Sequence, residues 1–264
     1  MKKFKAMKLL VLLLTVLTMA SGCADSKTAS PGKESAEKTS YTMGLDDTFA
    51  PMGFRDEKGN LAGFDIDLAN EAAKRMGVTI NFQPIDWTMK ETELNAGNID
   101  FIWNGYTITD SRKEKVNFSQ TYLENSQIIV VLAGSDVKTK AELAGKSVAV
   151  QAESSALDAV NTDPDFVSSL KELVEFSTNN EAFMDVEAGR SEALVVDEVL
   201  ARYYMKQKGQ EKYRVLEENF GDEEYAVGVR KSDTELLKKL NDAFDQMRSD
   251  GTYEKIYAKW FSEN

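Results

Sequence analysis

Hydrophobic and polar positions alternate with two different periods from residue 41 onward. Residues 41–45 (YTMGL) form a mostly apolar run that predicts a strand. Residues 63–77 (GFDIDLANEAAKRMG) carry an apolar residue about once per helical turn and end on a glycine, which predicts a helix that ends there. Residues 78–82 (VTINF) alternate apolar and polar positions and predict a second strand. The chain therefore begins as strand, helix, strand.

The same succession continues almost to the C-terminus. Further strands are predicted at residues 99–103, 146–151, 173–177, 192–196 and 226–230. A helical pattern follows most of them, and the chain closes with a long helix at 233–251 and a short one that ends at Trp260-Phe261. Alternation of this kind predicts the α/β fold class, with parallel-rich sheets covered by helices.

Ligands of such folds bind in the crevice at the C-terminal ends of the strands. The residues that follow predicted strands are therefore candidate binding residues, namely Asn104–Thr107, Gln151–Ser155 and Asp197. The first group leads into a helix start that contains Arg112. This arginine belongs either to a solvated charged face or to a clamp in which its guanidinium binds a carboxylate through two hydrogen bonds.

The first 22 residues predict a secretory signal peptide. A lysine-rich start precedes the apolar run Leu9–Leu17, which is shorter than the roughly 20 residues that span a bilayer. Cys23, the single cysteine, follows Ala20-Ser21-Gly22, as in a bacterial lipobox. We expect Cys23 to be lipidated, residues 23–40 to form a flexible tether, and the protein to lie on the outer face of the cell membrane. The alternative is an ordinary signal peptide with a chance cysteine.

Composition excludes several functions. The chain carries 32 basic and 44 acidic residues, a net charge of −12, which disfavours binding to nucleic acid or to an anionic membrane surface. It has no histidine, which removes Ser-His-Asp and Cys-His catalysis and histidine metal sites. A single cysteine forms no internal disulfide. Phosphate-cradle and metal-ligand motifs are absent from the sequence, so we predict no cofactor and no metal.

Several motifs stand in an order that resembles one protein family. They are GLDDTFAPMGF, GNLAGFDIDLANEAAKRMG, AGNIDFIWNGYTITDSRKEKVNFSQTY, LAGKSVAVQ, AGRSEALVVDE and RSDGTYEKIYAKWF. Together they look like the family-3 solute-binding proteins of bacterial amino-acid ABC importers. The resemblance implies a two-lobed periplasmic-binding fold of type II, a monomer, a free amino acid as ligand and an ABC permease as partner.

The resemblance also implies which residues hold the common head of an amino acid. Arg112 matches the arginine that binds the α-carboxylate, and Thr107 matches a hydroxyl residue that contacts both carboxylate and ammonium. Gly105 matches the position whose carbonyl accepts from the ammonium. Asp197 matches the carboxylate that pairs with the ammonium, although an aspartate between strand and helix is also an ordinary helix cap.

Other residues would line the rest of the site. Ser154 and Ser155 open a predicted helix, where they would offer N–H groups to an anion, cap the helix, or both. The remaining positions are two aromatics matched to the ligand's side chain, one acid matched to the far end of polar side chains, Asn104 beside a core tryptophan, and Glu153, a carboxylate where the family usually has glycine. The aromatics are Phe49 and Trp87, and the acid is Asp46.

We expect the chain to cross twice between lobes, near 127–131 and 224–229. Lobe 1 would comprise residues 41–129 plus 226–264, and lobe 2 residues 130–225. The acids near the site favour a cationic ligand such as arginine or lysine, with glutamine or cystine as alternatives. Two other functions stay open at this point: an exported enzyme resembling prephenate or arogenate dehydratases on the same fold, and a ligand sensor.

The lipid anchor leads to a first prediction. If Cys23 is lipidated, the protein partitions with membranes in a detergent phase separation, and Cys23→Ala releases it or leaves the signal uncleaved. Membrane fractionation of both proteins checks this. A mutant that loses its signal peptide and is still retained by the membrane would contradict the anchor.

Overall fold

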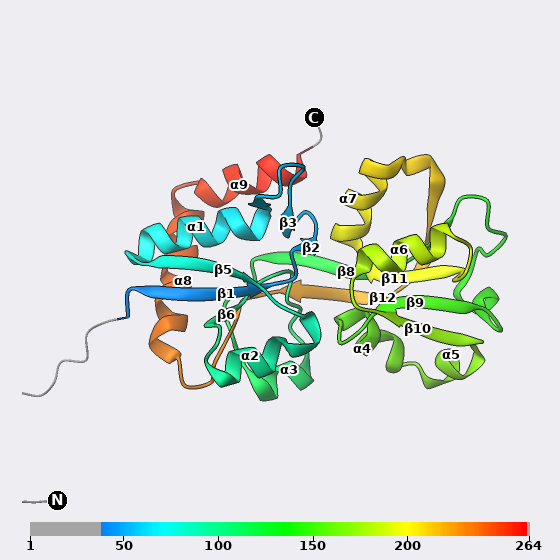
Figure 1. Cartoon of the computed structure of the whole chain (residues 1–264), viewed down its shortest axis with the longest axis horizontal. Coiled ribbons are helices and arrows are strands. Elements are labelled where there is room, and N and C mark those ends of the chain that lie inside the picture. Colours follow the sequence, from blue (N-terminus) through cyan, green and yellow to red (C-terminus); the bar gives the residue numbers. More distant parts are fainter. Residues whose placement is uncertain (1–37, 263–264) are drawn as a thin grey trace, which may run out of the picture. The chain divides into compact units, whose positions relative to one another are not determined.

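The computed structural model describes residues 38–262, and the predicted signal peptide, Cys23 and most of the predicted tether lie outside them. The described residues form two five-stranded sheets and one small antiparallel sheet (Figure 1). The small sheet consists of β2 (Thr48–Phe49), β3 (Gly53–Arg55) and β4 (Leu61–Ala62). The α/β fold class is confirmed.

The first five-stranded sheet has the order β5-β1-β6-β13-β7. Its strands are β5 (Thr79–Pro84), β1 (Ser40–Leu45), β6 (Phe101–Ile102), β13 (Gly228–Val229) and β7 (Asn117–Phe118). β1 pairs in parallel with β5 and β6, whereas β13 runs antiparallel to its neighbours. The C-terminal ends of β1 and β6 therefore open at the same edge.

The second sheet has the order β10-β9-β11-β8-β12. Its strands are β10 (Glu172–Phe176), β9 (Ser147–Gln151), β11 (Ala193–Asp197), β8 (Leu123–Leu132) and β12 (Tyr213–Tyr225). The first three are mutually parallel, as predicted, while β8 and β12 are antiparallel to their neighbours. Since β8 follows β7 and β12 precedes β13, the chain passes twice between the two sheets.

Helices cover both sheets (Figure 1). Those between strands of the first sheet or after its last strand are α1 (Phe64–Met76), η1 (Trp87–Met89), α2 (Lys90–Ala96), α3 (Asp110–Lys115), α8 (Thr234–Ser249) and α9 (Thr252–Phe261). Those connecting strands of the second are η2 (Lys140–Leu143), α4 (Ser155–Asn161), α5 (Pro164–Ser169), α6 (Asn179–Glu187), α7 (Glu198–Lys208) and η3 (Gln210–Lys212). No helix within residues 38–262 combines the length and apolar character needed to cross a membrane.

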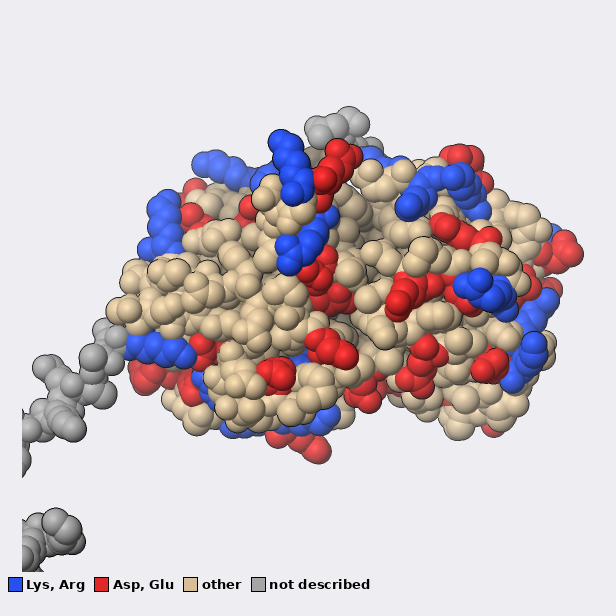
Figure 2. Space-filling view, in the orientation of Figure 1, with Lys and Arg blue, Asp and Glu red and all other residues tan. Residues whose placement is uncertain are grey.

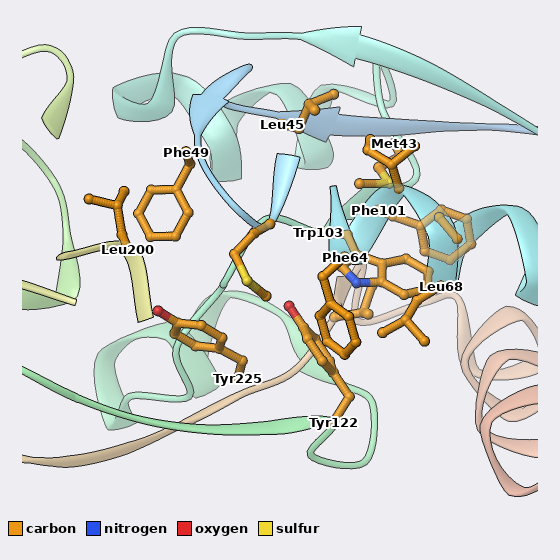
Figure 3. Packing of buried hydrophobic residues seen from close by; sticks show 14 of the residues in the cluster. Met43, Leu45, Phe49, Phe64, Leu68, Phe101, Trp103, Tyr122, Leu200 and Tyr225 are labelled. Atoms are coloured by element: carbon orange, nitrogen blue, oxygen red, sulfur yellow. The ribbon is translucent and has the colours of Figure 1, made fainter. Parts of the chain in front are cut away.

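Aromatic side chains pack between the first sheet, its helices and the connecting strands (Figure 3). Trp103 is fully buried, as expected for a core residue, and its ring lies 6.2 Å from Tyr122 and 5.6 Å from Phe244. Tyr122 in turn stacks on Phe244 at 6.0 Å. These contacts fix the loop that follows β6, which is where the candidate site begins.

Helix α1 starts without a side-chain cap. The N–H groups of Phe64 and Asp65 instead donate to the carbonyls of Pro51 and Met52, at 2.8 and 2.9 Å. This close backbone approach requires Gly63, whose φ is 143°, and a Cβ at that position would lie 2.1 Å from the Met52 carbonyl oxygen. Only glycine fits both the conformation and the space.

This contact generates a stability prediction. Gly63→Ala should destabilise the protein by more than about 2 kcal/mol, because strained backbone and overpacking each cost about 1–3 kcal/mol. Gly59→Ala is the matched control, since Gly59 also has positive φ (82°) but open space around its Cβ position. Urea unfolding of both variants measures the two losses, and equal losses would contradict the steric argument.

Candidate functional site

The loops at the C-terminal strand ends of the two sheets meet. Thr107 Oγ1, after β6, lies 3.0 Å from Ser155 Oγ, after β9. Gln151 Nε2 donates to Asp46 Oδ2, after β1, at 2.9 Å. All of the predicted ligand-contacting residues except Glu153 are buried. The sequence therefore led to a real meeting point of side chains.

The Arg112 side chain is buried at this meeting point. Thr109 caps α3 by accepting from the Arg112 N–H, and the Arg112 side chain is 3% exposed. Its Nη1 donates to the Thr107 carbonyl at 3.0 Å and its Nη2 to the Glu153 carbonyl at 3.4 Å. The interpretation of Arg112 as part of a solvated charged face is therefore wrong.

The contacts of the Arg112 guanidinium within the described residues are with neutral groups. Within residues 38–262, no carboxylate forms an ion pair with its guanidinium, which contacts backbone carbonyls and the ring of Tyr106 at 4.6 Å. A buried charge is costly unless a counter-charge accompanies it. The arrangement is suited to receive an anionic group from outside the chain.

Carboxylates gather close by. Asp197 Oδ1 accepts from Asn125 Nδ2, Gln127 Nε2 and the Tyr225 hydroxyl at 2.7, 2.9 and 2.6 Å. It stands at the start of α7, but its side chain makes no capping hydrogen bond, so it is not an ordinary cap. Burial, and then the negative charge of Glu223, raise the pKa of Asp197.

Glu223, in β12, is the second carboxylate of this cluster. Its Oε2 accepts from Thr107 Oγ1 at 2.9 Å and Gln127 Nε2 at 2.8 Å, and Ser155 Oγ lies at 3.3 Å. No Lys or Arg of the described chain forms an ion pair with Asp197 or Glu223. A pocket of about 480 Å³ lined largely by acidic side chains reaches Glu223 and Asn125. Figure 2 shows acidic side chains near the middle of the face in view.

A buried carboxylate fixes the turn at Gly105. Its φ is 57°, and its N–H donates to Asp65 Oδ2 at 2.8 Å, to which the Tyr122 hydroxyl also donates at 2.9 Å. Asp65 is completely buried, and this burial raises its pKa to about 7. A Cβ on Gly105 would lie 2.9 Å from the Phe49 ring, so glycine permits the close packing of this turn.

The residues expected around the ligand's side chain have mixed surroundings. Phe49 and Trp87 are buried, and Asp46 accepts from the Thr48 N–H and hydroxyl as well as from Gln151. Asn104 is 1% exposed, and neither its amide oxygen nor its amide nitrogen has a partner in the described chain. Contact of these residues with a ligand's side chain therefore stays a prediction.

The loop before α4 combines a cap with a strained residue. Ser154 accepts from the Leu157 N–H at 3.1 Å, so it caps α4. Glu153 has a φ of 52° and an exposed side chain, while its carbonyl faces inward to Arg112 and to Lys90 Nζ, 2.9 Å away. The Glu153 carboxylate therefore lies on the solvent side of this turn.

Sequence reasoning missed five residues of the site. They are Asp65, Lys90, Asn125, Gln127 and Glu223. The GFDIDL motif was the available signal for Asp65. A lysine at position 90 is typical of a solvent-exposed helix position. Asn125, Gln127 and Glu223 lie in β8 and β12, two strands whose sequences show no clear alternation of apolar and polar residues.

Comparison with known proteins now identifies the class. Residues 41–263 match the bacterial extracellular solute-binding proteins, family 3, and the chain belongs to this family. Its relatives are amino-acid-binding proteins of ABC importers, and the fold is the type II fold of periplasmic amino-acid-binding proteins, as the resemblance implied.

Individual relatives differ in the ligand they are named for. The chain is 30% identical to the L-cystine-binding protein TcyJ of Escherichia coli (strain K12), covering 85% of this chain and 84% of TcyJ. It is 32% identical to the lysine/arginine/ornithine-binding periplasmic protein of the same strain, covering 98% of each. A Streptococcus pneumoniae ABC uptake transporter substrate-binding protein with bound histidine is 43% identical, with a TM-score of 0.83 and coverage of 85% of this chain and 93% of that one.

The buried acid Asp65 generates a pH prediction. The folded protein keeps a proton on Asp65 up to about pH 7, whereas the unfolded chain releases it near pH 4. Stability of the unliganded protein should therefore fall by about 2 kcal/mol from pH 5 to pH 7. Asp65→Asn should reduce this slope, and part should remain because the pKa of Asp197 is also raised.

Urea unfolding at both pH values checks this. The control is Asp56→Asn, because Asp56 is only partly buried and its pKa is lowered, so it stays ionised throughout this range. Stability that is constant or rises between pH 5 and pH 7 would contradict the assignment.

Proposed function

We propose that the protein binds a free L-α-amino acid with a polar side chain outside the cell and delivers it to an ABC permease. The observation that carries the proposal is the pair of uncompensated charges in the buried site. Within residues 38–262, Arg112 forms no ion pair with a carboxylate, and Asp197 and Glu223 form none with a lysine or arginine, although the Arg112 charge acts on Asp197 from a distance. An amino-acid zwitterion supplies both an anion and a cation.

Thr107 shows how close the cationic and the acidic ends of the site are to each other. Its carbonyl accepts from Arg112 and its hydroxyl donates to Glu223, so one residue touches both the cationic and the acidic end. The α-carboxylate and α-ammonium of an amino acid are attached to one carbon, so they are separated by a similar short distance. The relatives that are named for cystine, histidine and basic amino acids support the same head-group chemistry.

Contacts between the two proposed lobes support delivery of the bound amino acid to a permease. We place lobe 1 at residues 41–129 plus 226–264 and lobe 2 at residues 130–225. The contacts of Thr107 with Ser155 and of Asp46 with Gln151 then join the lobes. A ligand held by Arg112 and Asp197 adds contacts to both lobes, which favours the closed state that a permease would recognise. A lipidated Cys23 and a monomeric protein complete the proposal.

The side chain of the ligand is proposed only as polar. The sequence favoured a cationic one, but the acids on which that rested have other surroundings. Asp47 pairs with Arg55 at 2.6 Å, Asp46 accepts from Thr48 and Gln151, and Glu153 faces solvent. Arginine, lysine, histidine, glutamine and cystine therefore all belong in the test.

One neighbour bears on the enzyme alternative. An ancestral amino-acid-binding protein described as a precursor of cyclohexadienyl dehydratase is 36% identical, with a TM-score of 0.77 and coverage of 85% of this chain and 96% of that one. That neighbour is itself named as a binding protein, so it adds no support for catalysis here.

A thermal-shift screen of the twenty amino acids plus cystine and ornithine tests the function. At 100 times its Kd, a ligand should stabilise the protein by about 2.7 kcal/mol. Arg112→Ala should weaken every amino-acid ligand by about 2–5 kcal/mol, because all share the α-carboxylate. Arg112→Lys should also bind weakly, since an ammonium cannot make the planar two-bond contact.

The control is Lys113→Ala, because Lys113 lies next to Arg112 on α3 but is exposed and pairs with Asp110. It should bind like the unmodified protein in calorimetry. Near-unchanged affinity of Arg112→Ala, or no amino acid that shifts the melting temperature, would contradict the proposed function.

A further inference from the structure

Lys90 is a buried cation at the site that the proposed function does not use. It is the first residue of α2 and is 1% exposed. Its Nζ donates to the Trp87 carbonyl at 3.1 Å and to the Glu153 carbonyl at 2.9 Å, and it lies 5.3 Å from the Trp87 ring centroid. Lysine is almost never fully buried unless its charge has a role or a partner.

Lys90 and Arg112 converge on one oxygen. Arg112 Nη2 reaches the same Glu153 carbonyl at 3.4 Å. Two cationic groups that share one acceptor are close neighbours, and their repulsion must be offset. A backbone carbonyl carries only a partial negative charge, so it offsets this repulsion less well than a carboxylate would.

The surroundings of Lys90 compensate its charge only in part. Glu91 Oε2 lies 3.5 Å from Nζ, but Oε1 of the same carboxylate is engaged by the Tyr106 hydroxyl at 2.9 Å. The other charged groups that act on Lys90 or are acted on by it are Arg112 from α3, Glu153 from the loop before α4, and Asp86 before η1. Burial first, and then the Arg112 charge, lower the pKa of Lys90 to about 8.

We propose that Lys90 is a second cation for the ligand's α-carboxylate, which bridges Arg112 and Lys90 in the occupied site. This rests on the proposed function. The anionic end of the zwitterion then meets two cations, as its ammonium meets the two carboxylates Asp197 and Glu223. Lys90 acts on the head group that all amino acids share, so its contribution is independent of the ligand's side chain.

The test compares Lys90→Met with Lys113→Met, which removes an exposed lysine of α3. Calorimetry at pH 7 uses L-glutamine, L-histidine and L-arginine together with the α-carboxamide of each. Lys90→Met should weaken the binding of the three amino acids by a similar factor of about tenfold or more, because hydrogen bonds to charged groups are among the stronger ones. It should weaken the carboxamides much less, because their amide group carries no negative charge. Lys113→Met should change neither series.

A titration from pH 7 to pH 9 adds a readout that packing alone would not move. As Lys90 loses its proton, the ratio of the Lys90→Met Kd to the unmodified Kd should fall towards one. Titration of the ligand ammonium is common to both proteins and cancels in this ratio. Glu91 and Asp86 stay ionised over the range, since the pKa of each of these two carboxylates is lowered. Lys90→Arg, which keeps the charge, should recover part of the affinity and guards against misfolding of the Met variant.

Two results would mean that Lys90 only supports packing or lobe closure, and either would overturn the proposal. One is an equal loss of affinity for the amino acids and their carboxamides, and the other is a ratio of the two Kd values that is constant with pH. So would a Lys90→Met protein that binds like Lys113→Met. Failure of the unmodified protein to bind any amino acid would instead refute the proposed function, so the two failures are distinguishable.

Discussion

The site is built around charged side chains that form no ion pair with one another or with any other group of residues 38–262. Arg112 is 3% exposed and contacts carbonyl oxygens, while the buried Asp197 and the partly buried Glu223 accept from amide and hydroxyl donors. Burying such groups without counter-charges costs free energy, and hydrogen bonds to neutral groups offset only part of that cost. In the proposed complex, a zwitterion with its carboxylate towards Arg112 and its ammonium towards Asp197 would supply both counter-charges. We therefore expect the affinity for an amino acid to come mainly from ion pairs that its carboxylate and ammonium form with these side chains.

The fold holds these side chains in place through rigid supports behind each charged group. Thr109 caps the helix that carries Arg112, and Tyr225 and Asn125 hold Asp197 from the two connecting strands. Asp65 fixes the Gly105 turn through its N–H and the Tyr122 hydroxyl. These supports come from segments far apart in sequence, so the site exists only when both sheets are assembled. The closely packed aromatic core around Trp103 and Phe244 lies directly behind the loop that carries Gly105 and Thr107.

How far the sequence could predict the structure depended on whether a signal was local. Helix α1 and its end at Gly77 were predicted, because apolar spacing and a glycine with a φ of 68° are written into one short segment. The parallel strands β9 and β11 were predicted for the same reason, since buried strands are continuous apolar runs. Helix α5 was missed, although Asp163 and Pro164 form an ordinary helix start there. Strand β12 was missed because nearly half of its residues are charged and only β8 beside it reveals its pairing.

The candidate site followed the same rule. Residues that stand directly after strands, such as Thr107 and Asp197, could be proposed from position alone, and the resemblance to a family supplied their expected roles. Lys90 and Glu223 could not, because each is a charged residue in a segment whose pattern indicates a solvent-facing position. Lys90 is buried and Glu223 partly buried because the tertiary fold brings α2 and β12 against the same loops.

The most direct measurement is a crystal structure of the protein with the amino acid that binds most tightly. The account predicts electron density for one amino acid between the two sheets, with its carboxylate on Arg112 and its ammonium within hydrogen-bond distance of Asp197. Density in the reverse orientation, or bound elsewhere with Arg112 still contacting only backbone carbonyls, would contradict the central claim.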